Sequence, residues 1–272
     1  ADLQQSASFD PATDERLSDQ HQWANYVKGV FHLLRPHGIE VDRVNCTFAG
    51  SIPMGAGLSS SAALEVATAY ALIQHADTSL DPIEIAKVAQ AAEQQFAGCN
   101  CGLLDQFSSI FGVPSGLIYS DFRTLTTDNV ALPAEARFIM INPHIKHALA
   151  ESPYNERRES CEKAAAQLNQ HLDHSITTLR DVTWEQFTQH RHLIDPEAAQ
   201  RAEHVIAEIT RVGQAIEHLQ RQDLSAFGQL LFDSHETSRT AFENSCPELD
   251  TVVEAAQQAG ALGARLSGGG WG

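Results

Sequence analysis

Residues 53–64 have the composition of a phosphate-binding loop that leads into a helix, with the sequence Pro-Met-Gly-Ala-Gly-Leu-Ser-Ser-Ser-Ala-Ala-Leu. The two glycines allow a tight turn and a close approach of the backbone to a ligand. The apolar residues of the segment 59–75 predict a helix that begins at the serines. The first N–H groups of a helix lack internal partners, and the helix dipole places partial positive charge there. The segment therefore predicts a site for an anion such as a polyphosphate, and the alternative is a serine-capped helix that binds nothing.

The loop differs from other loops of known chemistry. A Walker A loop requires Gly-x-x-x-x-Gly-Lys-Ser/Thr, and no lysine lies between Lys28 and Lys87. The sequence also lacks the Gly-x-Ser-x-Gly nucleophile elbow and the strand–GxGxxG–helix pattern of dinucleotide-binding folds. The charge of a bound phosphate must therefore be met by N–H groups, hydroxyls and a metal ion.

Two carboxylates can complete a site for phosphoryl transfer, which needs a divalent cation and a group that orients or deprotonates the acceptor. Magnesium usually takes one or two oxygen ligands from the protein, so Ser61 plus one carboxylate would suffice, and Glu93 is a candidate. Asp105 stands among apolar residues after Gly102, and a buried carboxylate needs a partner or a task. The alternatives are a solvated helix carboxylate for Glu93 and a capping role for Asp105.

Length and charge narrow the class of protein. The 272 residues can form one large or two ordinary domains, and a hydrophobic content of 43% is that of a globular protein. A net charge of −17 argues against nucleic acid or an anionic membrane surface as a partner. The sequence shows no signal peptide and no apolar run of about 20 residues. We therefore expect small-molecule partners and a cytoplasmic location.

The cysteines and histidines carry no obvious chemistry. The five cysteines include Cys99-x-Cys101, which lacks a second Cys/His pair at zinc spacing, so we expect reduced thiols. The thirteen histidines include His190 and His192 and lie in polar, helical stretches, so we expect them at the surface.

The order of elements is mixed α and β without strict βαβ alternation, which favours an α+β fold. The apolar pattern predicts helices over residues 23–34, 59–75, 82–96, 155–174, 183–193, 196–220, 224–238 and 247–258. It predicts strands over residues 41–52, 116–122, 137–141 and 263–267. The turn-rich segment 124–135 is the expected domain boundary.

Three segments together resemble a known family. Residues 53–65, 100–112 and 263–272 resemble, in order and spacing, the motifs of the GHMP small-molecule kinases, and most closely those of the galactokinase branch. Residues 22–30 resemble the helix that precedes the loop in that branch. Residues 146–158 and 245–250 resemble segments that other GHMP kinases lack. The resemblance runs from about Gln22 to Gly272.

The resemblance implies a two-domain α+β fold with a mixed-sheet N-terminal domain that carries the glycine loop and its helix. The expected domains are residues 1–134 and residues 135–272. Each is expected to be incomplete, because the family's first and last strands are missing. The chain is therefore expected to be a piece of a longer protein, truncated at both ends.

The resemblance also implies a sugar kinase that transfers phosphate from ATP to the C1 hydroxyl of galactose, with ATP and Mg²⁺ as cofactors. Ser61 and Glu93 would hold the magnesium ion, and Trp23 would lie near the adenine, although a core tryptophan is the alternative. The residues implied at the ATP phosphates are Gly55, Ala56, Gly57, Leu58, Ser59, Ser60 and Ser61.

At the sugar, the resemblance implies that Asp105 is the base facing the C1 hydroxyl. Gly102 and Tyr154 would line the sugar pocket, and the loop of residues 268–270 would close near the sugar and the phosphates. The sequence departs from the family at two places. The family's N-terminal signature supplies a catalytic arginine and a Glu-His-Asp cluster that bind galactose, and no Gly-Glu-His-Thr-Asp-like string occurs in this sequence. In addition, Trp271 replaces the usual phenylalanine.

Because of these departures, activity of the piece by itself is left open. Two alternatives also stay open. One is another GHMP sugar kinase, such as an N-acetylgalactosamine kinase, and the other is a non-catalytic sensor of ATP and galactose. A monomeric state is expected, with no nucleic acid and no membrane as partner.

Overall fold

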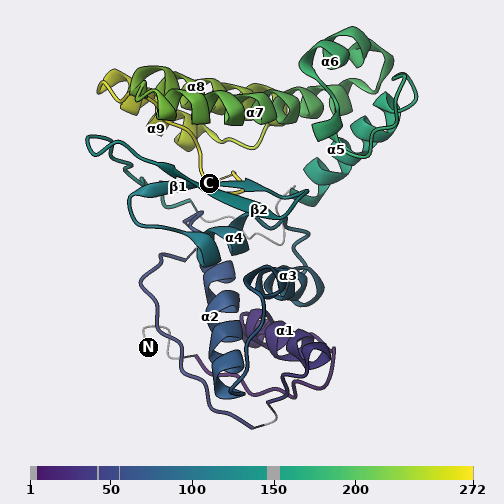
Figure 1. The fold of residues 1–272 in the computed structure, drawn as a ribbon, viewed down its shortest axis with the longest axis vertical. Helices are drawn as coiled ribbons and strands as arrows, with labels where there is room; N and C mark the ends of the chain where they lie inside the picture. The colour runs from purple at the N-terminus through teal and green to yellow at the C-terminus, as the bar shows by residue number, and fades with distance from the viewer. Residues whose placement is uncertain (1–4, 42, 55, 146–153, 272) are drawn as a thin grey trace. The chain divides into compact units, whose positions relative to one another are not determined.

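The structure is a computed structural model that describes residues 5–41, 43–54, 56–145 and 154–271 (Figure 1). The chain divides into two compact units, residues 1–129 and residues 130–272. The predicted bounds of 1–134 and 135–272 stay a prediction. In the described part of the chain, strands β1 (Gly116–Asp121) and β2 (Thr126–Ala131) form a two-stranded sheet. Their short connection makes them an antiparallel hairpin.

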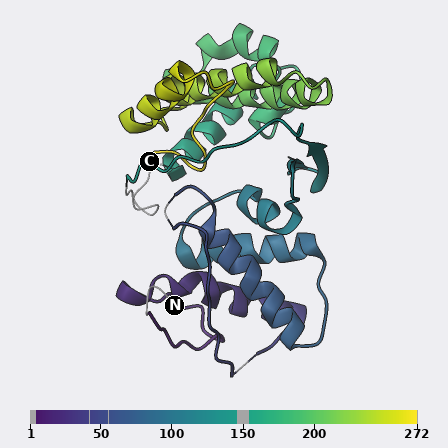
Figure 2. The same ribbon diagram turned by 90° about the vertical axis from the view of Figure 1, so that its left-hand side faces the viewer.

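The first unit is built on helices that pack around one apolar core, with bounds α1 (Ala24–Leu34), α2 (Ser60–His75), α3 (Pro82–Ala92) and α4 (Leu104–Phe111). Figure 1 and Figure 2 show α1, α2 and α3 side by side. Val27, Val30 and Leu34 recur at helical spacing along α1, and they pack on apolar residues of α2 and α3. At Gly29 the helices come so close that an added Cβ would lie 2.8 Å from the Ala92 Cβ.

Helix α3 changes its winding where it reaches the candidate site. After Ala92 the helix continues as a π-helical turn, Glu93–Ala97, which ends at Gly98 in a left-handed conformation (φ 85°). Turns of this kind are rare and frequently occur at functional sites. The predicted helix 82–96 is therefore found, with a change of register that begins at Glu93.

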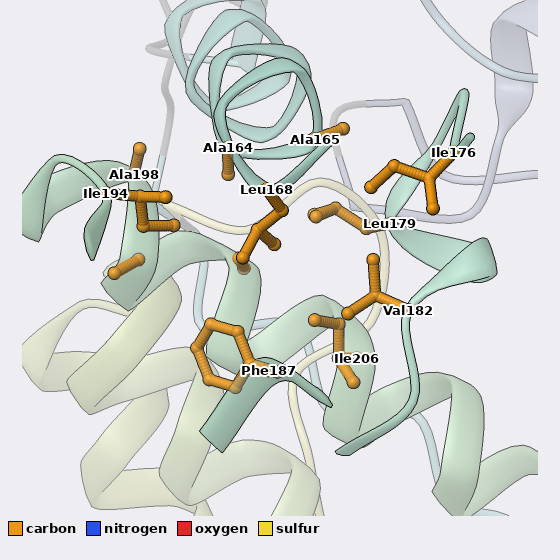
Figure 3. Close-up of a cluster of buried hydrophobic side chains, with 12 residues drawn as sticks. Ala164, Ala165, Leu168, Ile176, Leu179, Val182, Phe187, Ile194, Ala198 and Ile206 are labelled. Carbon is orange, nitrogen blue, oxygen red and sulfur yellow. The ribbon is translucent and has the colours of Figure 1, made fainter. Parts of the chain in front are cut away.

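The second unit is also mainly helical, with bounds α5 (Tyr154–Leu168), α6 (Trp184–His190), α7 (Pro196–Gln220), α8 (Leu224–Thr237) and α9 (Pro247–Gln258). Its core gathers Leu168 of α5, Phe187 of α6 and Ile206 of α7 (Figure 3). Helix α7 begins where predicted, because the Asp195 side chain accepts a hydrogen bond from the Ala198 N–H at 3.0 Å and Pro196 occupies the first turn.

The helical predictions are largely confirmed, and several of the strand predictions are wrong. Helix α5 ends at Leu168, short of the predicted 174, and β1 lies where a strand was predicted over 116–122. The segment predicted as a turn-rich boundary contains β2. The described residues of 41–52, and all of 137–141 and 263–267, form no strand. A strand needs a neighbour to accept its hydrogen bonds, and Ile139 is instead 81% exposed.

Among the described residues, none of the helices combines the length and the apolar character that a membrane crossing needs.

Candidate active site

The loop before α2 has the backbone geometry of an anion site. Gly57 (φ 65°) and Ser59 (φ 54°) both adopt left-handed conformations, which for a serine costs free energy and is typical of functional loops. The first hydrogen bond within the helix runs from the Ala63 N–H to the Ser59 carbonyl at 3.1 Å. Within the described part of the chain, no side chain caps the start of α2, so its first N–H groups are available to a ligand.

The predicted phosphate-binding residues lie in this loop and in the first turn of α2. Ala56, Leu58, Ser59, Ser60 and Ser61 are half-buried, and Gly57 is exposed. Gly55 lies outside the described residues. The arrangement gives hydroxyls and uncapped N–H groups at one helix end, which is chemistry suited to phosphate oxygens.

The two predicted metal ligands, Ser61 and Glu93, meet although they lie 32 residues apart. The Ser61 hydroxyl donates to Glu93 Oε1 at 3.1 Å, while the thiol of Cys101 lies 3.4 Å from Glu93 Oε2. Glu93 is only 4% exposed, and burial raises the pKa of its carboxyl. A hydroxyl and a carboxylate are ligands that magnesium prefers, and a cation here would offset the cost of burying the charge. The residues present therefore fit a magnesium ion.

A second buried carboxyl, Glu65, lies behind this pair on the inner face of α2. Glu65 and Gln106 are both 0% exposed. The Gln106 amide donates to Glu93 Oε2 at 2.9 Å and to Glu65 Oε2 at 3.4 Å. Burial, followed by the negative charge of Glu93, raises the pKa of Glu65 to about 10. Glu65 is therefore a neutral acid at pH 7 and not a second buried anion.

This shift predicts how stability depends on pH. A group whose pKa rises on folding, here from 4.5 to about 10, stabilises the fold at low pH and loses that contribution as pH rises. Glu65→Gln, which cannot ionise, should therefore gain stability relative to the unmodified chain by about 1.4 kcal/mol per pH unit between pH 6 and 8. Denaturant unfolding at several pH values measures this difference. The matched control is Glu84→Gln at a half-buried position of α3, where the carboxylate pairs with Lys87, and parallel profiles for all three proteins would contradict the assignment.

Asp105 lies in the first turn of α4, where the helix dipole favours a negative charge. Its side chain is half-buried, and no group among the described residues donates a hydrogen bond to it. Burial is the largest cause of the raised pKa of both Glu65 and Glu93, and the negative charge of Asp105 raises both pKa values further. Asp105 therefore belongs to the same acidic cluster and keeps a carboxylate available to a ligand. Gly102 is exposed, with open space where a side chain would stand.

Trp23 occupies the N-cap position of α1 and packs against the apolar core of the first unit. Its indole N–H is buried and has no partner among the described residues. The core alternative therefore holds for the ring, and the predicted proximity to adenine stays a prediction.

In the second unit, Asn244 holds the glycine turn of residues 268–271. Its side-chain amide donates to the Gly269 carbonyl at 3.1 Å, and its own carbonyl accepts the Trp271 N–H at 2.7 Å. Gly270 has a φ of 96°, and a Cβ there would overlap the Asn244 carbonyl. The ring of Tyr154, a predicted sugar contact, lies 3.7 Å from where a Cβ of Gly269 would stand.

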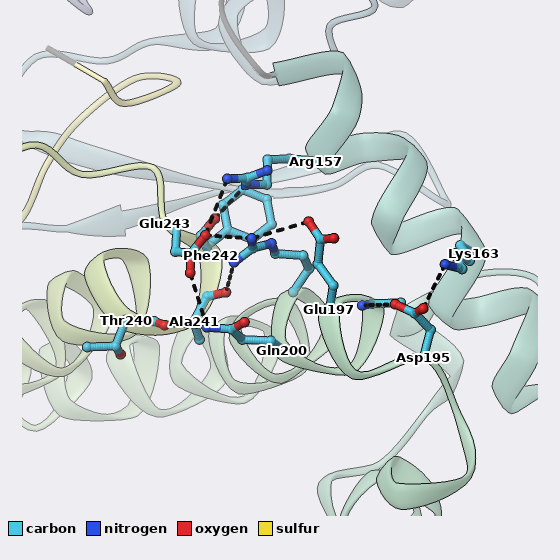
Figure 4. A network of polar contacts seen from close by, with 11 residues as sticks. Arg157, Lys163, Asp195, Glu197, Gln200, Thr240, Ala241, Phe242 and Glu243 are labelled. Atoms are coloured by element: carbon cyan, nitrogen blue, oxygen red, sulfur yellow. Dashed lines mark hydrogen bonds and ion pairs between the residues drawn. The ribbon is translucent and has the colours of Figure 1, made fainter.

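A network of ionic contacts fixes the chain just before Asn244 (Figure 4). Arg157, one turn beyond Tyr154 on α5, donates to the Phe242 carbonyl at 2.7 Å and lies 3.6 Å from the Glu243 carboxylate. Buried Arg201 of α7 bonds the same carboxylate at 2.6 Å. The hydrogen bond from Arg201 lowers the pKa of Glu243. The glycine turn and the start of α5 are thus held to one rigid point of the second unit.

The prediction that the histidines lie at the surface is wrong for two of them. His204 and His235 are both buried. Burial lowers the pKa of His204 to about 4, and its Nδ1 lies 2.9 Å from the Thr237 hydroxyl. His235 Nδ1 accepts the Leu266 N–H at 3.3 Å, so Nε2 carries the ring proton toward Asp250, 3.2 Å away. These contacts stabilise the second unit.

Comparison with known proteins identifies the class. The family model described as "GHMP kinases N terminal domain" matches residues 25–113, and the model described as "GHMP kinases C terminal" matches residues 215–272. The chain is therefore a GHMP kinase by family, and a kinase family implies the use of ATP. The predicted α+β fold class is confirmed.

Within that class the chain belongs to the galactokinase family. It is 39% identical to the galactokinase of Pasteurella multocida (strain Pm70) over 277 residues, which cover 100% of this chain and 70% of the relative. It is 38% identical to the galactokinase of Thermotoga neapolitana over 260 residues, which cover 95% and 71%.

Solved structures agree with this assignment. The crystal structure of Lactococcus lactis galactokinase complexed with galactose superposes with a TM-score of 0.84 at 33% identity, covering 94% of this chain and 66% of that one. The likeness to L. major mevalonate kinase in complex with R-mevalonate is weaker. It gives a TM-score of 0.52 at 20% identity, covering 93% and 67%, and shows the fold alone. The chain thus spans about two thirds of the length of these relatives.

Proposed function

We propose that this chain supplies the phosphate-binding and acceptor-activating part of an enzyme that transfers the γ-phosphate of ATP to the C1 hydroxyl of galactose. The observation that carries the proposal is the contact of Ser61 with Glu93 beside the uncapped start of α2. The names of the relatives, and the complex of the Lactococcus lactis enzyme with galactose, favour galactose over N-acetylgalactosamine as the acceptor.

In this mechanism the N–H groups and hydroxyls at the start of α2 hold the phosphates of ATP in line with the acceptor. Ser61 and Glu93 would hold Mg²⁺, which neutralises charge on the phosphate oxygens when bound. Asp105 orients the sugar hydroxyl. It accepts the hydroxyl proton late, as the new bond from phosphorus to the sugar oxygen forms and the bond to ADP breaks. A sugar hydroxyl is too weak an acid to lose its proton to a carboxylate before attack.

The finer assignments belong to the proposal as well. They are Mg²⁺ as the cation, Gly102 and Tyr154 as sugar contacts, a monomeric state and a cytoplasmic location. The cytoplasmic location rests on the free cysteine thiols.

The metal assignment predicts a change in magnesium dependence. Ser61→Ala and Glu93→Ala should each raise the Mg²⁺ concentration that half-saturates nucleotide binding by about tenfold or more, because each removes one of two protein ligands. Calorimetric titration of the chain with the ATP analogue AMP-PNP at graded Mg²⁺ measures this.

The matched control is Glu84→Ala, a half-buried carboxylate on α3 that pairs with Lys87 at 2.7 Å and bonds no residue of the candidate site. Unchanged magnesium titrations in both site variants would refute the assignment. An ADP-release assay separates kinase from sensor. It is run on the polypeptide extended to the length of its relatives, and a protein that binds ATP and galactose without ADP release would be the sensor.

A further inference from the structure

Gln106 donates hydrogen bonds to the two most deeply buried carboxyls, those of Glu65 and Glu93, and is itself closed off from solvent. Its nitrogen lies 2.9 Å from Glu93 Oε2 and 3.4 Å from Glu65 Oε2, and the side chain is fully buried. An ionised carboxylate only accepts hydrogen bonds, so the nitrogen end of the amide must face Glu93. The two amide hydrogens therefore serve two different carboxyl groups.

These bonds decide where Glu93 points. Gln106 and Cys101 both contact Oε2, which leaves Oε1 for Ser61 at 3.1 Å. A carboxylate with one oxygen fixed in this way has little freedom to rotate, so its other oxygen stays at the serine. Side chains that hold a ligand through its second oxygen commonly affect metal affinity by 10–100-fold.

Gln106 is also the neighbour of Asp105 on α4, so its bonds fix more than Glu93. The side chain reaches from the first turn of α4 to Glu65 on α2 and to Glu93 at the π-helical turn after α3. A single amide thus ties together the three elements that carry the candidate site of the first unit. The hydrogen bond to Glu65 anchors the Gln106 amide to α2, because the Glu65 carboxyl is fully buried there.

We infer that Gln106 is a positioning residue, which holds the Glu93 carboxylate toward Ser61 and couples the cation site to the helix that carries Asp105. The inference rests on the proposed function, because it gives Gln106 its task through the cation that Ser61 and Glu93 would hold. Gln106 itself contacts neither cation nor substrate.

The test replaces Gln106 by methionine, which keeps the unbranched shape and removes the amide. We expect Gln106→Met to weaken Mn²⁺ binding to the AMP-PNP-bound chain about tenfold, as measured by electron paramagnetic resonance of free Mn²⁺. Binding of AMP-PNP without metal should stay within twofold. In a Glu93→Ala background the same substitution should have no further effect on Mn²⁺ affinity, which a merely structural role would not predict.

The matched control is Gln90→Met. Gln90 donates to the Cys101 carbonyl at 3.1 Å, an acceptor that Gln94 also serves at 2.7 Å, and it bonds neither carboxyl of the cluster. The Mn²⁺ affinity of the Gln90→Met variant should stay within twofold of that of the unmodified chain. If the Gln106→Met variant also kept the Mn²⁺ affinity of the unmodified chain, the inference about Gln106 would be overturned, and the proposed function would stand. An unmodified chain that binds no Mn²⁺ with AMP-PNP would overturn the proposed function and this inference with it.

A measurement on the unmodified chain covers the case in which Gln106→Met does not fold. Adding Mn²⁺ to the AMP-PNP complex should slow amide hydrogen exchange in α4 (Leu104–Phe111) as well as in the turn Glu93–Ala97, because Gln106 joins the two. Protection confined to the turn, with α4 unchanged, would show that they are not coupled and would overturn the inference.

Discussion

Asp105→Asn is expected to lower kcat at least a hundredfold while ATP binding stays near that of the unmodified protein. Asparagine keeps the shape of the side chain and its place in the first turn of α4, but it cannot accept the hydroxyl proton. General-base contributions are typically about 10²–10⁴-fold, or about 3–5 kcal/mol of activation free energy. The measurement is steady-state turnover by the polypeptide extended to the length of its relatives, together with AMP-PNP affinity.

The control for this experiment is Asp128→Asn, an exposed aspartate on β2 that should leave both quantities unchanged. If the kcat of the Asp105→Asn variant is near that of the unmodified protein, Asp105 is not the base. If turnover and nucleotide affinity both fall strongly, the carboxylate has a structural task at the start of α4, which is the capping alternative.

Local signals in the sequence were sufficient for most helices. Asp195-Pro196 and the proline at position 247 mark helix starts that the structure reproduces in α7 and α9. The glycine loop and its helix were predicted from glycine and serine spacing alone, because helix ends obey local rules.

The pairing of Ser61 with Glu93 could not be predicted from spacing. Glu93 near a helix end has the same local pattern as a solvated carboxylate, and only the packing of α2 against α3 decides its environment. The pairing of Ser61 with Glu93 was predicted only from the resemblance to the family's motifs. Gln106 and Glu65 were missed, although Glu65 shares a helical face with Ala62, Val66 and Ala69, and a carboxyl on an apolar face is a usable signal of burial.

The strand predictions for residues 41–52, 137–141 and 263–267 were wrong because a strand, unlike a helix, takes its hydrogen bonds from another segment. Residues 138–141 are four consecutive apolar residues, as in a buried strand, but they stay exposed and no strand pairs with them among the described residues. The histidine prediction was wrong for a related reason. The partners of His235 come from Leu266 and Asp250, which are distant in sequence.

Gly228→Ala and Gly213→Ala are expected to change stability in opposite directions, although both glycines lie within helices of the second unit. In α7, Gly213 is exposed, and an added Cβ would meet no atom within 4 Å. Alanine there should stabilise the fold by about 0.5–1 kcal/mol, because it restricts the unfolded chain and favours the helix. In α8, Gly228 is buried, and an added Cβ would overlap the Leu262 carbonyl.

The overlap at Gly228 is with backbone, so no change of side-chain rotamer can relieve it, and Gly263 in turn lies against the Gly228 carbonyl. The helix or the segment before the glycine turn must therefore move. We expect a loss of about 3 kcal/mol, which lowers Tm by roughly 6–12 °C in a chain of this size. Thermal unfolding of both variants measures the contrast. A Gly228→Ala variant as stable as Gly213→Ala would show that the close approach of α8 to residues 262–263 is absent in solution. Sequence alone assigns these two glycines the same helix penalty, and only the packing against Leu262 separates them.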